Sequence, residues 1–308
     1  MRTPFTGMGT ALVTPFTRDG AIDEPRIRQL VRRQVDAGIH FVSPCGTTGE
    51  APTLSHDEKL RIVEIVVDEV AGRVPVLAGA GGYDTREGIA LTRAFEQMGV
   101  GGILSVTPYY SKPTQDGLYE HYKAIAGSTG LPIVLYNVPG RTGVNLEVRT
   151  VARLAEIPNI VGLKEASGNV IQMCEVYAAC GAEFLLLGGD DPLTVAVMAI
   201  GGRGIISVAS NAMPAEMVQI VELCERGDYV AARKLHTWLL PLIQVNFVEA
   251  NPIPVKAAMA AMGLLEDAGR RYAYEESLMR PLPARPRSVL APDFRERREE
   301  ELLRDPAV

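Results

Sequence analysis

Short apolar runs alternate with longer amphipathic stretches along most of the chain. The runs are rich in Val, Ile and Leu and nearly continuous in hydrophobicity, which is typical of parallel strands buried on both faces. Turn-forming residues bound the runs. We therefore expect eight strands, at Thr10–Phe16, Phe41–Cys45, Val74–Gly79, Gly102–Thr107, Ile133–Asn137, Ile160–Lys164, Phe184–Gly188 and Gly204–Val208.

The stretches between these runs have a helical pattern. Apolar residues recur three and four positions apart in Asp57–Val70 and Thr85–Met98, which predicts helices with one buried face. Ser55 and Glu58 have the spacing of a capping box at the start of the first of these helices. Asp191, followed by a proline, is predicted to cap another helix.

Repeated strand-then-helix units predict a parallel sheet, and eight of them favour a closed (β/α)8 barrel, or TIM barrel, of the α/β class. A doubly wound open sheet is the alternative fold. That fold normally has a glycine fingerprint after its first strand, and Ala11–Phe16 contains no glycine. The barrel is therefore the predicted fold.

The end of the chain has a different pattern, in which helices follow one another without strands. Asp228–Val245 is a predicted helix with an expected kink at Pro241, and Ile253–Met262 is a second one. A further helix is expected around Arg295–Leu303, in a charged tail.

The 308 residues fit one large domain or two ordinary ones. No low-complexity linker separates the helical end from the predicted barrel. We therefore expect residues 1–227 to form a barrel that carries the active site, and residues 228–308 to form a C-terminal helical extension packed on it.

The composition argues against several classes of partner. A net charge of −6 gives no overall attraction to nucleic acid or to an anionic membrane. The N-terminus lacks the apolar region of a signal peptide, and no apolar run approaches the length of a membrane span. The four cysteines form no C-x-x-C pair and the four histidines are scattered. No metal site is therefore expected, and reduced thiols in a cytoplasmic protein are the simplest account.

Lys164 ends one of the predicted strands, where an inward-facing amine would lose the solvation of its charged form. Burial favours the neutral amine, which is the nucleophile that forms a Schiff base with a ketone. A strand-end lysine that points into solvent is the more common arrangement. The residues at the other strand ends decide between the two, because the loops after the strands build the active site of such a barrel.

Those loops carry polar residues suited to carbonyl chemistry. Gly46–Gly49 predicts a tight loop whose backbone N–H groups can receive a carboxylate. Tyr109 and Tyr110 either pack or supply a phenolic proton. Tyr136 is a candidate general acid/base beside the lysine. Arg141 either clamps a substrate carboxylate through two hydrogen bonds or lies on the surface of a turn.

The loops after the last two strands offer small residues. A side chain at Gly189 is expected to block the pocket, whereas Ser207–Asn211 are expected to leave room in it. An amine, a phenol, a hydroxyl, an anion-binding loop and an arginine thus converge on one face of the predicted barrel. This set suits carbonyl condensation better than metal-assisted hydrolysis.

Six strings of residues in this chain also resemble a known family. They occur in order between about Phe5 and Leu265, and they are Gly46–Glu50, Thr107–Tyr110, Tyr136–Gly143, Gly162–Ala166, Gly189–Asp191 and Asn251–Lys256. Together they resemble the dihydrodipicolinate synthase/N-acetylneuraminate lyase family of class I, pyruvate-dependent aldolases. Thr47-Thr48 and Arg141 favour its synthase branch, because the sugar-acid lyases usually carry Ser-Thr and generally lack this arginine.

The resemblance implies an activity. Lys164 would form an imine with pyruvate, and the derived enamine would attack the aldehyde of L-aspartate 4-semialdehyde. The product would be 4-hydroxy-tetrahydrodipicolinate, an intermediate of lysine and diaminopimelate biosynthesis. The resemblance implies no metal or organic cofactor. Two alternatives stay open, namely another pyruvate aldolase of the family, acting on a sugar acid or a hydroxy-oxoglutarate, and a non-catalytic paralogue.

The resemblance also assigns the site residues. Besides the lysine, the implied catalytic residues are Tyr136, which transfers protons, and Thr47 and Tyr110, which relay them to solvent. The implied substrate-binding residues are Thr48, Arg141, Gly189 and Ile206. In the family the second tyrosine comes from a neighbouring subunit, so the resemblance implies at least a homodimer and typically a homotetramer built as a dimer of dimers.

Some members of the family are inhibited by lysine bound at a subunit interface. The matching positions in this chain are Ala51, His56, Lys59, Gly81, Tyr83, Glu87 and Tyr109. Lys59 stands where the sensitive pattern has a histidine, and Tyr83 stands where it has an asparagine. A cation at Lys59 would repel the ammonium group of the effector, so we expect lysine inhibition to be weak or absent.

Overall fold

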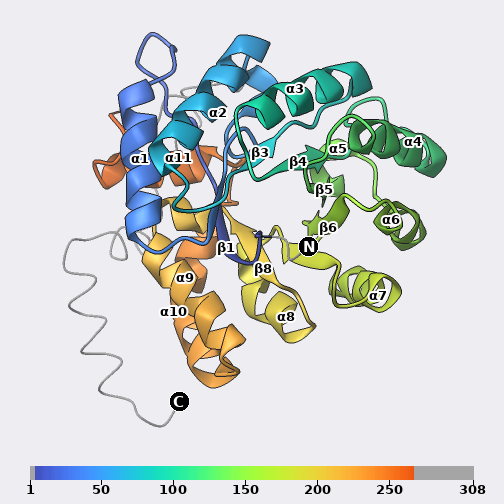
Figure 1. The fold of residues 1–308 in the computed structure, drawn as a ribbon. Coiled ribbons are helices and arrows are strands. Elements are labelled where there is room, and N and C mark those ends of the chain that lie inside the picture. Colours follow the sequence, from blue (N-terminus) through green and yellow to red (C-terminus); the bar gives the residue numbers. More distant parts are fainter. Residues whose placement is uncertain (1–3, 267–308) are drawn as a thin grey trace.

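Eight parallel strands form the centre of the molecule, in the order β2-β1-β8-β7-β6-β5-β4-β3. The computed structural model describes residues 4–266, and within them the strands are β1 (Gly7–Ala11), β2 (Phe41–Ser43), β3 (Leu77–Gly79), β4 (Gly102–Val106), β5 (Ile133–Asn137), β6 (Ile160–Glu165), β7 (Leu185–Gly188) and β8 (Gly204–Ser207). A parallel bridge joins Val42 of β2 to Val76, directly before β3, so the two ends of the sheet meet. The predicted (β/α)8 barrel is confirmed (Figure 1).

The helices surround this ring of strands (Figure 1). They are α1 (Glu24–Asp36), α2 (His56–Val70), α3 (Thr85–Gln97), α4 (Gln115–Ala126), α5 (Pro139–Thr142), α6 (Val148–Ala155), α7 (Val170–Cys180), α8 (Thr194–Ala199), α9 (Pro214–Glu225), α10 (Tyr229–Val245) and α11 (Ile253–Ala261), with short 3-10 helices η1 (Ala51–Thr53), η2 (Asp191–Leu193) and η3 (Ala209–Asn211). None of the helices within residues 4–266 is long and apolar enough to cross a membrane.

Helices α10 and α11 confirm the two helices predicted after the barrel. Helix α10 packs on α9 and α8, and α11 contacts η3. Pro241 lies inside α10, and a kink there stays a prediction. The helix expected around Arg295–Leu303 lies outside the described residues.

The predicted capping box is also confirmed. The Ser55 hydroxyl accepts a hydrogen bond from the Glu58 backbone N–H at 3.2 Å, and the Glu58 carboxylate accepts one from the Ser55 N–H at 2.8 Å. Helix α2 therefore begins where the sequence pattern places it, within one residue.

The first strand was predicted in the wrong place, because it spans Gly7–Ala11 rather than Thr10–Phe16. The two glycines of this strand made it a poor candidate by pattern. Gly9 nevertheless suits its position, since a side-chain carbon there would lie 2.2 Å from the ring of Phe41. The apolar residues that follow belong to a buried loop, in which Phe16 forms an antiparallel bridge with Ile22.

Asp191 is not the helix cap that was predicted. It is the first residue of η2, and the cap position is Asp190, whose side chain makes no capping hydrogen bond. The Asp191 carboxylate instead accepts hydrogen bonds from the backbone N–H groups of Val208 and Ala209, both at 2.9 Å. Burial raises the pKa of Asp191, and these hydrogen bonds oppose that rise. Asp191 thus ties the loop after β7 to the loop after β8.

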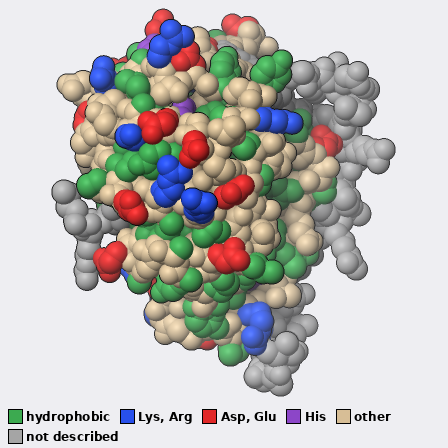
Figure 2. All heavy atoms as spheres, turned by 90° about the vertical axis from the view of Figure 1, so that its right-hand side faces the viewer, with side chains coloured by type: hydrophobic (Ala, Val, Ile, Leu, Met, Phe, Trp, Pro, Cys, Tyr) green, Lys and Arg blue, Asp and Glu red, His purple; other side chains and the backbone are tan. Residues whose placement is uncertain are grey.

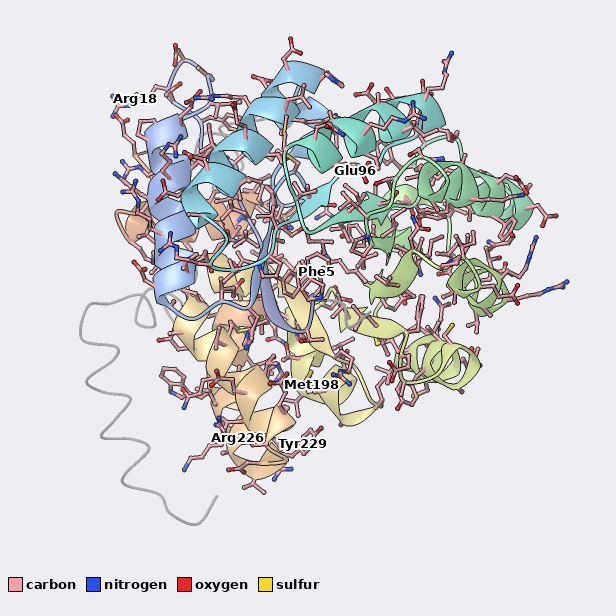
Figure 3. All side chains as sticks on the ribbon, in the orientation of Figure 1. Phe5, Arg18, Glu96, Met198, Arg226 and Tyr229 are labelled. Carbon is pink, nitrogen blue, oxygen red and sulfur yellow. The ribbon has the colours of Figure 1, made fainter. Side chains whose placement is uncertain are left out.

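The ring of strands is filled by side chains. Phe5 lies inside the ring (Figure 3) and packs edge-to-face on Phe41, with 5.7 Å between the ring centroids. Gly102, at the start of β4, leaves the space that the Phe5 ring occupies. Because Phe5 precedes β1, it closes the end of the barrel where the strands begin. Only the end where the strands finish is left for a site.

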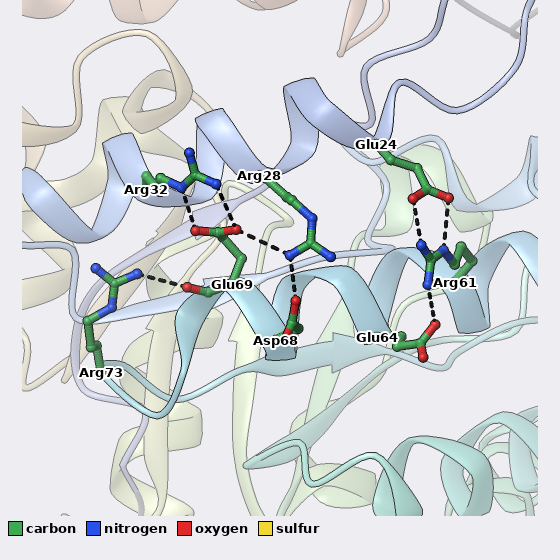
Figure 4. Close-up of polar contacts among 8 residues, drawn as sticks. All are labelled: Glu24, Arg28, Arg32, Arg61, Glu64, Asp68, Glu69 and Arg73. Carbon is green, nitrogen blue, oxygen red and sulfur yellow. Dashed lines mark hydrogen bonds and ion pairs between the residues drawn. The ribbon is translucent and has the colours of Figure 1, made fainter.

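Ion pairs link α1 to α2 on the outside of the barrel (Figure 4). Arg61 of α2 contacts Glu24 at 2.6 Å and Glu64 at 2.7 Å, and Arg32 of α1 contacts Glu69 at 2.6 Å. Hydrogen bonds from these arginines hold the pKa values of Glu24 and Glu69 below their usual range. Such exposed pairs contribute at most about 1 kcal/mol each, so the apolar layers carry most of the stability.

Charges of both signs are interspersed on the side of the molecule that Figure 2 shows. Arg153 of α6 pairs with Asp116 of α4 at 2.9 Å, and Lys123 pairs with Glu120 at 3.3 Å. This face therefore offers no single-sign field of the kind that attracts a polyanion.

Lys256 of α11 connects the C-terminal helices to the barrel through a buried ion pair. Its Nζ lies 2.7 Å from Glu50 Oε1 and donates to the carbonyl oxygen of Thr14 at 2.8 Å. The side chains of Lys256 and Glu50 are both fully buried. The loss of one partner would leave the other charge buried without its ion pair.

We expect Lys256→Met to lower the free energy of unfolding by about 3–5 kcal/mol, because Glu50 keeps a buried charge. Urea denaturation followed by circular dichroism measures this loss. The double variant Lys256→Met/Glu50→Leu should recover part of it. Lys123→Met is the matched control, since it breaks an exposed pair worth at most about 1 kcal/mol. A loss no larger than that of the control would contradict the assignment.

Candidate active site

Lys164 and Tyr136 face each other on neighbouring strands. They are register partners on β6 and β5. The Nζ atom of Lys164 lies 4.1 Å from the centroid of the Tyr136 ring. Lys164 is only 5% exposed, and no carboxylate among residues 4–266 forms a salt bridge with it. The amine is therefore held beside a phenol and away from solvent, as expected for a nucleophilic lysine.

A register shift places this pair together. The pairing of β5 with β6 runs from Ile133 opposite Ile160 to Val134 opposite Gly162, so β6 carries one extra residue, Val161. Without the extra residue, Tyr136 would lie opposite the residue before Lys164. Ile160 packs in the outer core, whereas Val161 packs against the barrel interior. Because side chains alternate along a strand, the extra residue turns Lys164 inward.

The residue after the lysine fixes the end of β6. Glu165 is fully buried, and its carboxylate accepts hydrogen bonds from Asn137 Nδ2 and Gln172 Nε2, both at 2.9 Å. It also accepts one from the backbone N–H of Ser167 at 2.7 Å. This network holds the backbone on which Lys164 sits.

Asp190 lies close enough to Lys164 for the charge of the lysine to affect its pKa. Burial raises the pKa of Asp190, and the positive charge of Lys164 opposes the rise. The neighbouring carboxylates of Asp191 and Glu165 raise it further. The loop after β7 therefore contributes a carboxyl group with a raised pKa near the amine.

The loop after β2 forms the expected tight turn. Gly49 and Ala51 donate backbone hydrogen bonds to the carbonyl oxygen of Gly46, at 3.1 and 3.3 Å. Glu50 has a left-handed φ of 58°. The N–H of Thr48 donates to none of the described residues. Such a turn presents backbone donors to an anion.

One cavity of about 540 Å3 opens at this end of the barrel, a size typical of small-molecule sites. Thr47, Tyr136 and Arg141 line it. Arg141 lies on α5, and its guanidinium donates to the backbone oxygen of Asn251 at 3.2 Å. The structure thus brings together three of the predicted site residues in one cavity.

The candidate effector residues line the same cavity. They are Ala51, His56, Lys59, Gly81, Tyr83, Glu87 and Tyr109. His56 Nδ1 lies 2.9 Å from Glu87 Oε1, and Tyr83 packs edge-to-face on Tyr109 with 5.3 Å between centroids. The candidate effector residues therefore line the same cavity as Thr47, Tyr136 and Arg141.

The other predicted residues lie outside the lining of this cavity. Lys164 sits behind Tyr136, and Ile206 is fully buried in the barrel interior beside that tyrosine. Tyr110 is 93% exposed, so a single chain does not bring it to the site. Residues Ser207–Asn211 do not line the cavity, so they do not provide the space expected of them. They are buried and hydrogen-bonded, for example Ser210 to Thr10 at 2.8 Å.

Gly189 does not line the cavity, so a side chain there would meet the lysine rather than block the pocket as expected. A side-chain carbon on Gly189 would lie 2.9 Å from Lys164 Cε and 2.5 Å from Ala166 Cβ. Any larger residue would therefore displace the lysine side chain or its neighbour. A substrate-binding role for Gly189 stays a prediction.

Sequence reasoning missed several residues that support the site. Asn251, Glu50 and Lys256 lie within strings that were recognised, but no role was assigned to them. Glu165 was missed in the same way, next to the lysine itself. Their partners lie far along the chain, so no local spacing pointed to them.

A (β/α)8 barrel with a buried strand-end lysine against a tyrosine defines the class of lysine-dependent aldolases. Residues 4–275 match the sequence profile of the Dihydrodipicolinate synthetase family. The chain belongs to this family.

Relatives with assigned names cover most of the chain. The 4-hydroxy-tetrahydrodipicolinate synthase of Nitratidesulfovibrio vulgaris (strain DP4) is 51% identical over 85% of this chain and 90% of its own. That of Syntrophus aciditrophicus (strain SB) is 49% identical over 88% and 92%.

Solved structures agree with the fold. The 4-hydroxy-tetrahydrodipicolinate synthase of Methylacidiphilum fumariolicum SolV matches with a TM-score of 0.88 and 41% identity, over 97% of each chain. A monomeric dihydrodipicolinate synthase variant matches with a TM-score of 0.86 and 40% identity, over 94% of this chain and 95% of that one.

We expect Gly189→Ala to slow covalent capture of pyruvate by Lys164. Overpacking of this kind costs about 1–3 kcal/mol, which is roughly 5- to 150-fold in rate. Borohydride trapping of the imine over time measures it. Gly82→Ala is the control, because Gly82 lines the cavity and a side-chain carbon there meets nothing within 4 Å. Equal rates for the two variants would show that position 189 has no influence on the lysine.

Proposed function

We propose that the chain is a Schiff-base-forming lyase that condenses pyruvate with L-aspartate 4-semialdehyde to give 4-hydroxy-tetrahydrodipicolinate. The observation that carries the proposal is the Lys164 amine, buried within 4.1 Å of the Tyr136 ring centroid. Relatives about half identical to this chain bear the name of that synthase, which supports the choice of substrates.

The chemistry begins at Lys164. Its neutral amine attacks the keto carbon of pyruvate, and loss of water gives an iminium ion. The iminium acts as an electron sink, so a methyl proton leaves and an enamine forms. The enamine carbon bonds to the aldehyde carbon of the second substrate. The amino group of that substrate then displaces Lys164, which closes the ring and frees the enzyme.

The remaining site residues manage protons and carboxylates. Tyr136 donates and accepts the protons, and Thr47 and Tyr110 relay them to solvent. The backbone N–H groups of Thr47 and Thr48 hold the pyruvate carboxylate, and Arg141 binds the carboxylate of the aldehyde substrate. Gly189 and Ile206 shape the pocket around the ketone. All of these groups belong to loops or strand ends at one end of the barrel.

The site also implies an assembly. Tyr110 projects from the surface with 93% of its side chain exposed and a left-handed φ of 69°. We propose that it reaches the site of a neighbouring subunit, which makes the active form at least a homodimer and, as a dimer of dimers, a homotetramer. A monomeric variant exists among the solved relatives, so membership of the family alone does not fix the assembly.

Two further properties belong to the proposal. Within the described residues, 228–266 extend the barrel as a helical appendix rather than a second domain, in keeping with the packing of α10 on α9. The enzyme works in the cytoplasm, where its thiols stay reduced.

Incubation with pyruvate followed by borohydride should label Lys164 and no other lysine, because among the described residues only this amine is buried without a salt bridge. Peptide mapping by mass spectrometry locates the label. Lys164→Arg should abolish labelling. Lys256, which is buried against Glu50, and Lys123, which pairs with Glu120 on the surface, serve as internal controls. A label on either of these, or none at all, would overturn the mechanism.

The same preparation distinguishes the synthase from a sugar-acid lyase. A coupled assay should detect turnover with aspartate semialdehyde and none with N-acetylneuraminate, because Arg141 suits a short substrate with its own carboxylate. If Lys164 is labelled but the chain turns over N-acetylneuraminate and not aspartate semialdehyde, the Schiff-base mechanism stands and the proposed substrate is wrong.

We expect L-lysine to inhibit weakly or not at all. Lys59 lines the cavity, and no carboxylate among the described residues pairs with it, so its ammonium group repels a cationic effector. Tyr83 adds a ring where a smaller amide would fit. Steady-state rates at rising lysine concentrations measure the effect, and Lys59→His/Tyr83→Asn should be more sensitive than the natural chain. Inhibition of the natural chain by sub-millimolar lysine would refute this expectation.

A further inference from the structure

Asn251 lies between the two groups proposed to hold the substrate carboxylates. It directly precedes Pro252, the cap residue of α11, and it is only 4% exposed. Its side chain contacts Thr48 and its backbone contacts Arg141, which lie 203 and 110 residues away along the chain. No other described residue forms hydrogen bonds to both.

The side chain of Asn251 determines the hydrogen-bonding role of the Thr48 hydroxyl. Asn251 Nδ2 donates to Thr48 Oγ1 at 2.8 Å. A threonine hydroxyl has one proton to donate, and the amide N–H cannot accept it. No described residue accepts a hydrogen bond from the Thr48 hydroxyl. The Thr48 hydroxyl is thereby kept as a donor for an incoming anion.

The backbone of Asn251 determines where Arg141 lies. The carbonyl oxygen of Asn251 accepts a hydrogen bond from Arg141 Nη2 at 3.2 Å. This bond leaves most of the guanidinium donors available for a carboxylate. Since the acceptor is a backbone atom, substitution of the Asn251 side chain leaves this bond in place.

The segment that carries Asn251 is fixed to the barrel. Lys256, five positions further on, binds Glu50 Oε1 at 2.7 Å and the Thr14 carbonyl oxygen at 2.8 Å. Glu50 belongs to the same turn as Thr48. The start of α11 and the anion-binding turn are therefore held as one unit.

We propose that Asn251 is a positioning residue for both substrates. Its amide directs the Thr48 hydroxyl proton toward the carboxylate of pyruvate, and its carbonyl oxygen orients Arg141 toward the carboxylate of the aldehyde. This inference rests on the proposed function. It adds that the C-terminal helical segment, outside the eight strand-and-helix units, sets the affinity for the ketone.

The two roles separate in a single substitution. Asn251→Ala removes the amide and keeps the carbonyl oxygen. We expect the pyruvate concentration that half-saturates borohydride trapping on Lys164 to rise about 3- to 10-fold, the effect of one net hydrogen bond. The KM for aspartate semialdehyde and kcat should each change less than about 2-fold.

Asn251→Asp keeps the size of the side chain but reverses its chemistry. The carboxylate would accept the Thr48 proton and place a negative charge beside the anion-binding turn. We expect the half-saturating pyruvate concentration to rise by more than about 10-fold. This variant decides the matter if Asn251→Ala does not fold.

Asn246→Ala is the matched control. Asn246 is the cap residue directly after α10, is 1% exposed, and its side-chain polar atoms have no hydrogen-bond partner among the described residues. The same truncation there should leave both substrate dependences unchanged within about 2-fold. Thermal melting of all variants measures any general loss of structure.

A double variant tests the path through Thr48. In a Thr48→Val background the hydroxyl is absent, so Asn251→Ala should raise the half-saturating pyruvate concentration no further. The proposal is overturned if Asn251→Ala weakens both substrates equally, if it leaves pyruvate trapping unchanged, or if its effect persists in that background. Failure of the natural chain to label Lys164 would instead overturn the proposed function itself.

Discussion

One extra residue at the start of β6 determines which face of the strand carries Lys164. Side chains alternate between the two faces of a strand, so a slip of one position exchanges the interior for the exterior. Val161 supplies that slip, and it brings Lys164 to the inner face opposite Tyr136. The tight packing of the ring around this pair then keeps water from the amine.

The polar groups around this pair are arranged by elements remote in sequence. The turn after β2 and the short helix α5 carry the groups proposed to bind the carboxylates, and both are held by the segment leading into α11. The buried contact of Lys256 with Glu50 makes that segment part of the barrel. The C-terminal helices thus belong to the site as much as the strands do.

The sequence was sufficient for the fold because the repeated alternation of buried strands and one-sided helices leaves few architectures open. It failed at β1, where Gly7 and Gly9 weaken the strand pattern and Gly9 makes room for Phe41. It also failed at Asp191, whose carboxylate binds the backbone of the next loop rather than its own helix.

The candidate site was predictable only in part. Lys164, Tyr136 and Arg141 were recognisable because reactive groups at strand ends share one face of a barrel. Asn251 and Glu165 were not, since their partners are set by tertiary structure. The register shift at Val161 was equally hidden, because a strand pattern does not reveal which partner each residue faces.

Phe5, packed inside the ring against Phe41, closes the barrel at the end where the strands begin. With one end of the barrel closed, substrates and products must enter and leave through the cavity that Tyr136 lines. In the proposed reaction the ketone bonds to Lys164 inside the barrel, and the aldehyde binds nearer the open end. An aldehyde bound there would block the path to Lys164, so this shape favours binding of the ketone before the aldehyde.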